Sequence, residues 1–123
     1  MVDPTERFHV DGNALADAHT QTSDARLKEN VTPLENALGI VGALRGVRFD
    51  WRQDVGNLAG EGSDIGVIAQ EVAEVVPEVV HETESGYLTV DYAKLVPVLI
   101  EAIKAQQADL ADLRAIIERA GIQ

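Results

Sequence analysis

The chain has 123 residues and a net charge of −11, and it contains no cysteine. This length suits one domain with a modest core, which must come mainly from Val, Leu, Ile and Ala because the chain holds only two Phe, two Tyr and one Trp. The charge argues against nucleic acid as a partner, since phosphate binding needs clustered Lys and Arg, and the lack of cysteine excludes disulfides and thiolate chemistry. The sequence has no apolar run of the kind that would predict a signal peptide or a membrane span.

Residues 1–22 differ from the rest of the chain and hold too little apolar surface to fold alone. Residues 7–10 could form a short strand, and residues 11–13, Asp-Gly-Asn, are a turn signal. We interpret this segment as the end of something larger or as a connector to a partner.

The stretch from Thr22 to Asn30 places Ser23 five positions before Lys28. A serine hydroxyl paired with a deprotonated amine becomes a nucleophile, and Ser-Lys pairs occur as variants of the serine–histidine arrangement. The alternative is structural: Ser23 or Asp24 caps a short helical turn that runs toward Asn30, and Lys28 is solvated. The spacing alone does not choose between these interpretations.

The helical spacing of apolar residues next predicts a helix that begins near Pro33, with Thr32 as its N-cap. Gly42 and Gly46 are expected to end this helix. Residues 46–52 then alternate apolar and charged side chains, which predicts a half-buried strand.

This strand would carry Phe49 and Trp51 on one face, and we expect Trp51 to be a core anchor rather than a sugar platform. A glycine-rich exposed loop, residues 57–63, follows.

A short apolar run, residues 64–68, leads into a second helical pattern over residues 69–76. Residues 79–82 and 87–90 are two strand patterns, and the Glu-Ser-Gly sequence of residues 84–86 between them predicts a hairpin turn.

The last helix is predicted from Asp91, a good N-cap, to about Ala120. Pro97 lies inside this range and should either kink the helix or mark its true first turn.

Apolar residues in this helix alternate steps of four and three, which gives a heptad seam about three repeats long. The seam consists of Leu99, Ile103, Gln106, Leu110, Leu113, Ile117 and Ala120. Two interpretations stay open: a coiled coil whose register Gln106 helps to fix, or a single amphipathic helix that lies on its own domain. Ile116 beside Ile117 widens the apolar stripe, which suits a trimer or a packed helix better than a narrow dimer seam.

Five segments, in this order and at these gaps, together resemble one family. They are residues 23–30, 44–51, 65–72, 76–80 and 90–104. The chain from about residue 22 to 107 is similar to the endosialidase-type intramolecular chaperone domain, a serine-peptidase family found at the carboxyl end of phage tail fibres and tailspikes. The resemblance implies a domain that trimerises, aligns the upstream chains and then cuts itself off.

The resemblance also implies roles for residues near the scissile bond. Ser23 matches the family's nucleophile and Lys28 its general base, so the cut falls beside Ser23, at Thr22–Ser23 or at Ser23–Asp24. Thr22, Asp24, Arg26 and Asn30 are the expected neighbours of the cleavage site.

The chemistry adds two conditions. Lys28 must be neutral to accept a proton, which burial or nearby cations such as Arg26 would favour and Glu29 would oppose. Residues five apart lie about 140° around an ideal helix and do not meet. Either Ser23 therefore precedes the helix, in the capping turn, or the two groups meet across chains, which would make cleavage depend on assembly.

No cofactor or metal site is expected. His9, His19 and His81 are far apart in the sequence and nominate neither a catalytic triad nor a metal set. Asp54, Glu61 and Asp64 flank the glycine-rich loop, but the calcium-loop pattern is absent.

Taken together, the sequence predicts an α+β fold with a short sheet or hairpins, several helices and a long carboxyl-terminal helix that forms a trimeric coiled coil. Residues 1–22 are the connector, residues 23–123 the chaperone domain, and residues 91–120 the trimerisation helix. The expected interface residues are Leu99, Ile103, Gln106, Leu110, Leu113 and Ile117.

The leading functional hypothesis is an intramolecular chaperone of a phage-type tail fibre or tailspike, released by single-turnover Ser-Lys autoproteolysis; at most, the chain is a self-cleaving serine endopeptidase. The alternative is a non-cleaving trimeric tip or attachment domain of a phage or phage-like particle. Expected partners are two further copies of the chain and an upstream fibre segment or a tail or baseplate protein, with no nucleic acid and no membrane. The expected location is the virion tail fibre or a phage-like particle, after assembly in the host cytoplasm.

Overall fold

The computed structural model describes residues 20–56 and 59–121. The chain divides into two compact units, residues 1–33 and residues 34–123, and each is described by itself. The strand and turn expected in residues 7–13 lie outside the described residues. In the part of the chain that the structure describes, no helix has the length and apolar character to cross a membrane.

The described part of the first unit contains one short helical turn, η1, Ala25–Leu27. Asp24 is its N-cap, because the carboxylate accepts a hydrogen bond from the backbone N–H of Arg26 at 2.8 Å. The predicted capping turn is confirmed, and Asp24 rather than Ser23 provides the cap.

The second unit begins with helix α2, Ala37–Ala43, which starts later than predicted. The assignment of Thr32 as N-cap and Pro33 as the helix start is wrong, because Asn36 has a left-handed backbone (φ 61°) that a right-handed helix does not continue through. The Asn36 side chain lies over Gly39, where an added Cβ would be 2.5 Å from its amide oxygen. Gly42 lies within the helix rather than ending it.

An antiparallel pair follows, β1, Val47–Asp50, and β2, Ser63–Gly66. The register pairs Val47 with Gly66 and Asp50 with Ser63, so the predicted strand in residues 46–52 is confirmed in a shorter form. The apolar run after the loop is its partner strand, an assignment that the sequence left open.

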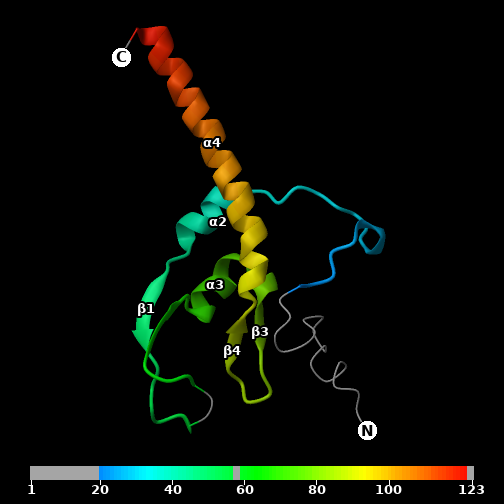
Figure 1. The fold of residues 1–123 in the computed structure, drawn as a ribbon, viewed down its shortest axis with the longest axis vertical. Coiled ribbons are helices and arrows are strands. Elements are labelled where there is room, and N and C mark those ends of the chain that lie inside the picture. The colour runs from blue at the N-terminus through cyan, green and yellow to red at the C-terminus, as the bar shows by residue number, and fades with distance from the viewer. Residues whose placement is uncertain (1–19, 57–58, 122–123) are drawn as a thin grey trace. The chain divides into compact units, whose positions relative to one another are not determined.

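The chain then forms helix α3, Ala69–Val75, a 3₁₀ turn η3, Pro77–Val79, and a hairpin of β3, Val80–Glu82, and β4, Leu88–Val90 (Figure 1). Gly86 supplies the left-handed conformation (φ 89°) that the hairpin loop needs. The predicted hairpin and the predicted helix before it are both confirmed.

Two small clusters of buried aliphatic residues form the core of the second unit. One joins Val72, Val76 and Val79 and packs beneath the hairpin and α3. The other joins Ala37 of α2 to Val98 and Ala102 of the last helix. Partly buried Ile40 packs against both clusters and so connects them.

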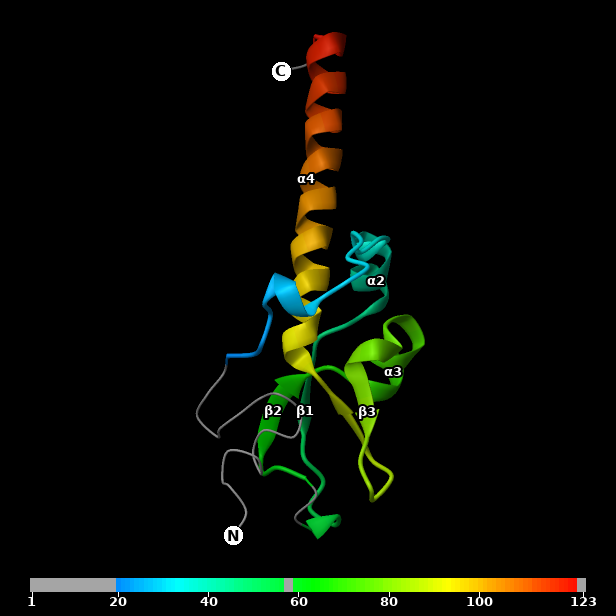
Figure 2. The ribbon, with the colours of Figure 1, turned by 90° about the vertical axis from the view of Figure 1, so that its right-hand side faces the viewer.

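The last helix, α4, Leu95–Ala120, has 26 residues and follows a 3₁₀ turn η4, Tyr92–Lys94. Pro97 lies in its first turn, where the missing N–H has no intrahelical partner to lose. Gly121 ends it with a left-handed backbone (φ 73°), so the predicted end is confirmed. Beyond α2, the carboxyl-terminal part of α4 extends away from the strands of its unit (Figure 2).

The fold is therefore α+β, as predicted, with two small antiparallel sheets, short helices and one long carboxyl-terminal helix.

Candidate functional site

Ser23 and Lys28 lie next to each other within one chain. The Nζ atom of Lys28 donates a hydrogen bond to the Oγ atom of Ser23 at 2.8 Å. This contact is possible because Ser23 precedes η1 and Lys28 follows it with extended backbone (φ −121°, ψ 148°), so the two do not lie on one helix face. Of the two geometries considered from the sequence, the structure adopts the capping-turn arrangement.

A ring of contacts between Asp24 and Arg26 fixes the turn between these residues. Besides the backbone N–H, the Nε and Nη2 atoms of Arg26 donate to the Asp24 carboxylate at 3.1 and 2.8 Å. These bonds hold the pKa of Asp24 below its ordinary value and raise the pKa of Arg26. Arg26 was considered from the sequence as a cation that could act on Lys28. Its positive charge is instead compensated by the Asp24 carboxylate.

The whole Ser-Lys stretch is exposed to solvent. Thr22, Ser23 and Lys28 are each exposed, and Asn30 turns the chain with a left-handed backbone (φ 57°). In this state the Lys28 amine donates to the serine, whereas a general base has to accept the serine proton. The two groups are close enough for a proton to pass between them.

The second candidate surface is an apolar stripe along α4. Its members Leu99, Ile103, Leu110 and Leu113 are 47%, 58%, 51% and 52% exposed, and Gln106 is also exposed, while Ile117 is half-buried. The helix uses a different side for its own domain, since its buried residues are Val98 and Ala102, which pack with α2.

Leu99 and Ile103 each follow one of these buried residues by one position, about 100° around the helix axis. The stripe is therefore left uncovered by the described part of the second unit.

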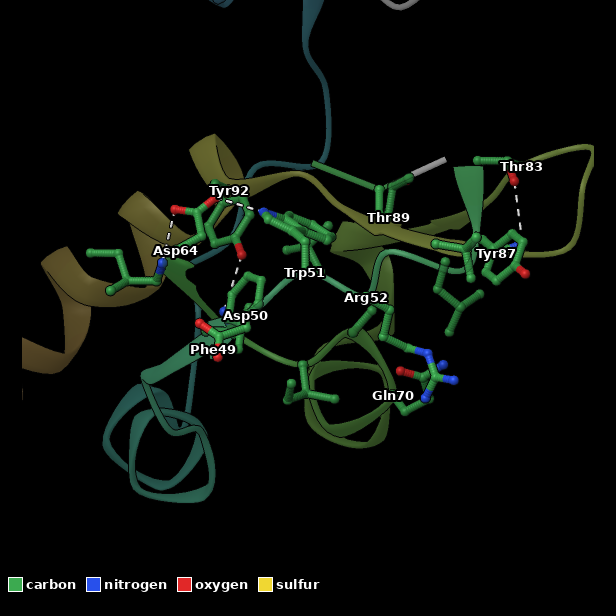
Figure 3. A pocket seen from close by; sticks show the side chains of 18 of the residues that line it. Phe49, Asp50, Trp51, Arg52, Asp64, Gln70, Thr83, Tyr87, Thr89 and Tyr92 are labelled. Atoms are coloured by element: carbon green, nitrogen blue, oxygen red, sulfur yellow. Dashed lines mark hydrogen bonds between the residues drawn. The ribbon is translucent and has the colours of Figure 1, made fainter. Parts of the chain in front are cut away.

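A groove of about 990 Å³ lies between the β1–β2 pair, the start of α3 and the β3–β4 hairpin (Figure 3). Trp51 lies in it, half-buried, with its ring in an edge-on contact with Phe49 at 4.9 Å between centroids. The Trp51 Nε1 atom donates to the Asp64 carboxylate at 3.2 Å. The predicted shared face of Phe49 and Trp51 is confirmed, but Trp51 lines a groove instead of sitting in either buried cluster.

Tyr92 is the residue of this region that sequence reasoning missed. Its hydroxyl oxygen accepts a hydrogen bond from the backbone N–H of Val67 at 3.0 Å and lies over Gly66. Tyr92 and Val67 do not belong to one helix or one hairpin, so no regular spacing in the sequence indicates their contact.

An ion pair of Arg45 with Glu71 joins the segment after α2 to α3, with Nη2 and Oε2 2.8 Å apart. It holds the pKa of Glu71 below its ordinary value and raises that of Arg45. Within residues 20–56 and 59–121, no group of three His, Asp or Glu side chains gathers as a metal site. His9 and His19 lie outside that range.

Comparisons with known proteins give one family match and several similar tail fibre proteins. The family model described as chaperone of endosialidase matches residues 23–81, a range that begins at the serine of the Ser-Lys contact. The long tail fiber protein Gp37 of Enterobacteria phage K3 is 39% identical over 97 residues, which cover 76% of this chain and 8% of that protein.

Its counterpart in Enterobacteria phage T2 is 39% identical over 97 residues, covering 7% of that protein. Gp37 of Enterobacteria phage M1 is 29% identical over 117 residues, which cover 87% of this chain and 47% of that protein. The chain thus spans less than a tenth of the first two relatives and about half of the third.

The second unit is an α+β fold that ends in a long helix, and the first unit carries the Ser-Lys contact. Residues 23–81 of the chain belong to the chaperone-of-endosialidase family.

Proposed function

We propose that this chain is the intramolecular chaperone of a phage tail fibre, that it acts as a homotrimer, and that it is released by cleavage beside Ser23. Three things support this proposal. They are the family match, the similarity to long tail fibre proteins, and the 2.8 Å contact between Lys28 Nζ and Ser23 Oγ, which carries the cleavage part. On this proposal the chain is a component of the virion or of its assembly in the host cytoplasm.

The chaperone role answers a kinetic problem of fibres. Intertwined β-structure needs pairing between distant residues, which forms slowly and exposes unpaired edges. A trimeric seed holds three chains together at high effective concentration, in alignment. Cutting then leaves a product that unfolds slowly, because the seed no longer helps the chains to separate. The partners are accordingly two further copies of this chain and the upstream fibre segment.

The uncovered stripe on α4 supports assembly of three chains. The exposed Ile100 and Ile116 flank the stripe and broaden it beyond a two-residue seam. Branched Ile103 and Ile117 with Leu99 and Leu113 also occur in two-stranded coiled coils, so a sizing measurement distinguishes the two states.

In the proposed cleavage, neutral Lys28 accepts the hydroxyl proton of Ser23 while Oγ attacks the carbonyl carbon of the scissile bond. The peptide C–N bond breaks, the leaving amine takes a proton, and water later hydrolyses the ester. Attack of Ser23 on its own carbonyl would close a strained lactone ring. This reasoning favours the Thr22–Ser23 bond over Ser23–Asp24.

In this proposal, assembly of the chains is what makes Lys28 neutral. Lys28 is exposed here, and covering it with a neighbouring chain would remove water that stabilises its ammonium form. Cleavage would then start only after the three chains have met, which protects against premature release. A cleavage rate that stays constant over a wide range of protein concentration would contradict this step.

The test compares intact masses of the purified wild-type chain, Ser23→Ala, Lys28→Arg and the matched control Lys104→Arg, each with a sizing run. We expect the wild type and Lys104→Arg to be shortened at Ser23. Ser23→Ala should stay full length, and Lys28→Arg should be cut at least about a hundredfold more slowly because a guanidinium keeps its proton. A full-length wild-type trimer would overturn cleavage and leave the chaperone role standing.

The exposure of both Ser23 and Lys28 favours one other candidate, a trimeric fibre tip that is never cut. In that case the Asp24–Arg26 pair and the Ser-Lys contact only cap and brace a turn. The same experiment separates the two functions, since the tip predicts identical masses for all four proteins.

A further inference from the structure

The apolar stripe of α4 is bordered by charges whose positions follow the same heptad. The seam residues occupy two positions of the heptad. Position a holds Ile103, Leu110 and Ile117, and position d holds Leu99, Gln106 and Leu113. This assignment determines which residues lie at the flanking positions g and e. Asp109 is then at g, and Arg114 is at e of the next heptad. These are the two positions that face each other across neighbouring helices.

Asp109 and Arg114 are not used by the chain's own fold. Both are exposed, and no ion pair among residues 20–56 and 59–121 involves either of them. On their own helix they are five residues apart, about 140° around the axis, so their charged groups point in different directions. The solvent-facing pair Glu101–Lys104, in contrast, is already joined at 3.3 Å.

We propose that Asp109 of one chain pairs with Arg114 of its neighbour and that this ion pair makes the α4 helices assemble parallel and in register. The inference rests on the self-association in the proposed function and adds its orientation. The occupant of the stripe is a second copy of this chain, because the charge complementarity is between two of its own positions.

Orientation follows from the geometry of the two flanks. In a parallel, in-register pair, position g faces e of the following heptad on the neighbour, which brings Asp109 beside the neighbour's Arg114. In an antiparallel pair, g faces g and e faces e, so like charges would meet or the register would have to shift. A shift of one heptad in the parallel pair would set Asp109 against Gly121 or Gln107 instead of Arg114.

Gln106 strengthens the same register from inside the seam. It is the one polar residue among the central seam positions 99–117, and it is exposed in the single chain. Only in the in-register arrangement do the Gln106 amides of all chains share one layer and hydrogen-bond to one another. A shifted register would bury each amide against leucine or isoleucine.

The test uses the full chain with two charge reversals, Asp109→Arg and Arg114→Asp, and their equimolar mixture. Ser23→Ala is included in every protein so that no chain is cut. Asp112→Arg is the matched control, since it makes the same change at an exposed position, c of the heptad, which lies outside the g and e flanks. Sedimentation equilibrium measures self-association of each protein at low and at high salt.

We expect each reversal to weaken self-association by on the order of tenfold, because it turns attraction into repulsion at every interface. The mixture should recover part of this loss, since two of the three interfaces of a mixed trimer then join a chain with two arginines to a chain with two aspartates at the flanks. High salt should narrow the differences, and Asp112→Arg should associate like the parent.

Failure of the two proposals gives different results. A parent chain that stays monomeric overturns self-association, and the ion pair with it. A parent that associates while the reversals have no effect, or while the mixture shows no recovery, overturns the ion pair and leaves the chaperone proposal intact.

Discussion

At the scale of single residues, Tyr92 links two parts of the second unit. Its hydroxyl oxygen accepts the Val67 N–H at 3.0 Å, at the point where β2 ends and the chain turns toward α3. A Cβ on Gly66 would lie 2.5 Å from the same oxygen. The glycine therefore leaves the space that the hydroxyl occupies, and the two residues act as one contact.

This contact predicts non-additive substitutions. Tyr92→Phe removes the acceptor and should cost about 0.5–1.5 kcal/mol of unfolding free energy. Gly66→Ala should cost a similar amount because the methyl group displaces the hydroxyl, so the double variant should cost clearly less than the sum. Urea unfolding of the four proteins measures this.

The control is Gly46→Ala, since nothing lies within 4 Å of the Cβ position there. This substitution should be close to neutral and should add independently to Tyr92→Phe. Strict additivity of Gly66→Ala and Tyr92→Phe would show that the two residues do not share a contact.

The sequence nominated Ser23 and Lys28 but not their distance. Their contact depends on η1 being a single 3₁₀ turn followed by extended backbone at Lys28, whereas a longer α-helix would have separated them. Turn type at this length is decided by local hydrogen bonds such as those of Asp24 to Arg26, which periodicity does not reveal. The Tyr92–Gly66 contact is invisible for a different reason, because it is made by tertiary packing alone.

At the scale of elements, α4 presents two sides with different roles. Val98 is 2% exposed and packs with Ala37 of α2, while Leu110 is 51% exposed in the single chain. Both are aliphatic members of one helix, so only their surroundings separate them. One side stabilises the fold, and the proposed role of the other is to bind further copies.

Alanine substitutions should separate the two sides. Val98→Ala should cost about 2 kcal/mol of unfolding free energy at any protein concentration. Leu110→Ala should leave the dilute chain within about 0.5 kcal/mol of wild type but weaken self-association by on the order of tenfold or more. Unfolding at high dilution and sedimentation at high concentration measure the two effects.

A loss of stability for Leu110→Ala in the monomer would show that α4 folds back on its own domain through the stripe. That result would restore the amphipathic-helix interpretation.

Among the elements, period and turn chemistry were sufficient for the hairpin and for the end of α4. Two local patterns are strong. One is the alternation in β3 and β4 with Gly86 between them, and the other is the heptad repeat that ends before Gly121. The predicted start of α4 at Asp91 was wrong, because a 3₁₀ turn comes first, the α-helix begins at Leu95, and the Asp91 side chain makes no capping hydrogen bond. The start of α2 was mispredicted because Pro33 is a common first residue of a helix, and the left-handed backbone of Asn36 has no sequence signal of comparable strength. The side of α4 that faces α2 also required the structure, since its small Ala102 looks unremarkable in the sequence.

At the scale of the whole molecule, the described part of the chain buries few large apolar side chains. Its buried residues are small or branched, namely Ala37, Val72, Val76, Val79, Val98 and Ala102. Leu99, Ile100, Ile103, Leu110, Leu113 and Ile116 of one helix are all about half exposed. The proposed association would bury these side chains.

Stability should therefore depend on protein concentration. If only folded chains associate, the Tm of the Ser23→Ala protein should fall by roughly a few degrees for each tenfold dilution. Calorimetry over two or three dilutions measures this, with Leu110→Ala as the comparison, which should show a flatter dependence. A Tm independent of concentration in the Ser23→Ala protein would mean that the single chain is stable without its copies.

The hydrogen bonds that shape the Ser-Lys turn join residues within the short stretch 23–28: Asp24 with Arg26 and Leu27, Ala25 with Lys28, and Ser23 with Lys28. A genetic exchange that spliced the chain from this stretch onward behind a different fibre would carry the arrangement across unchanged. If a fibre segment precedes the serine, as proposed, that segment could then change in sequence while the contacts within residues 23–28 stayed the same.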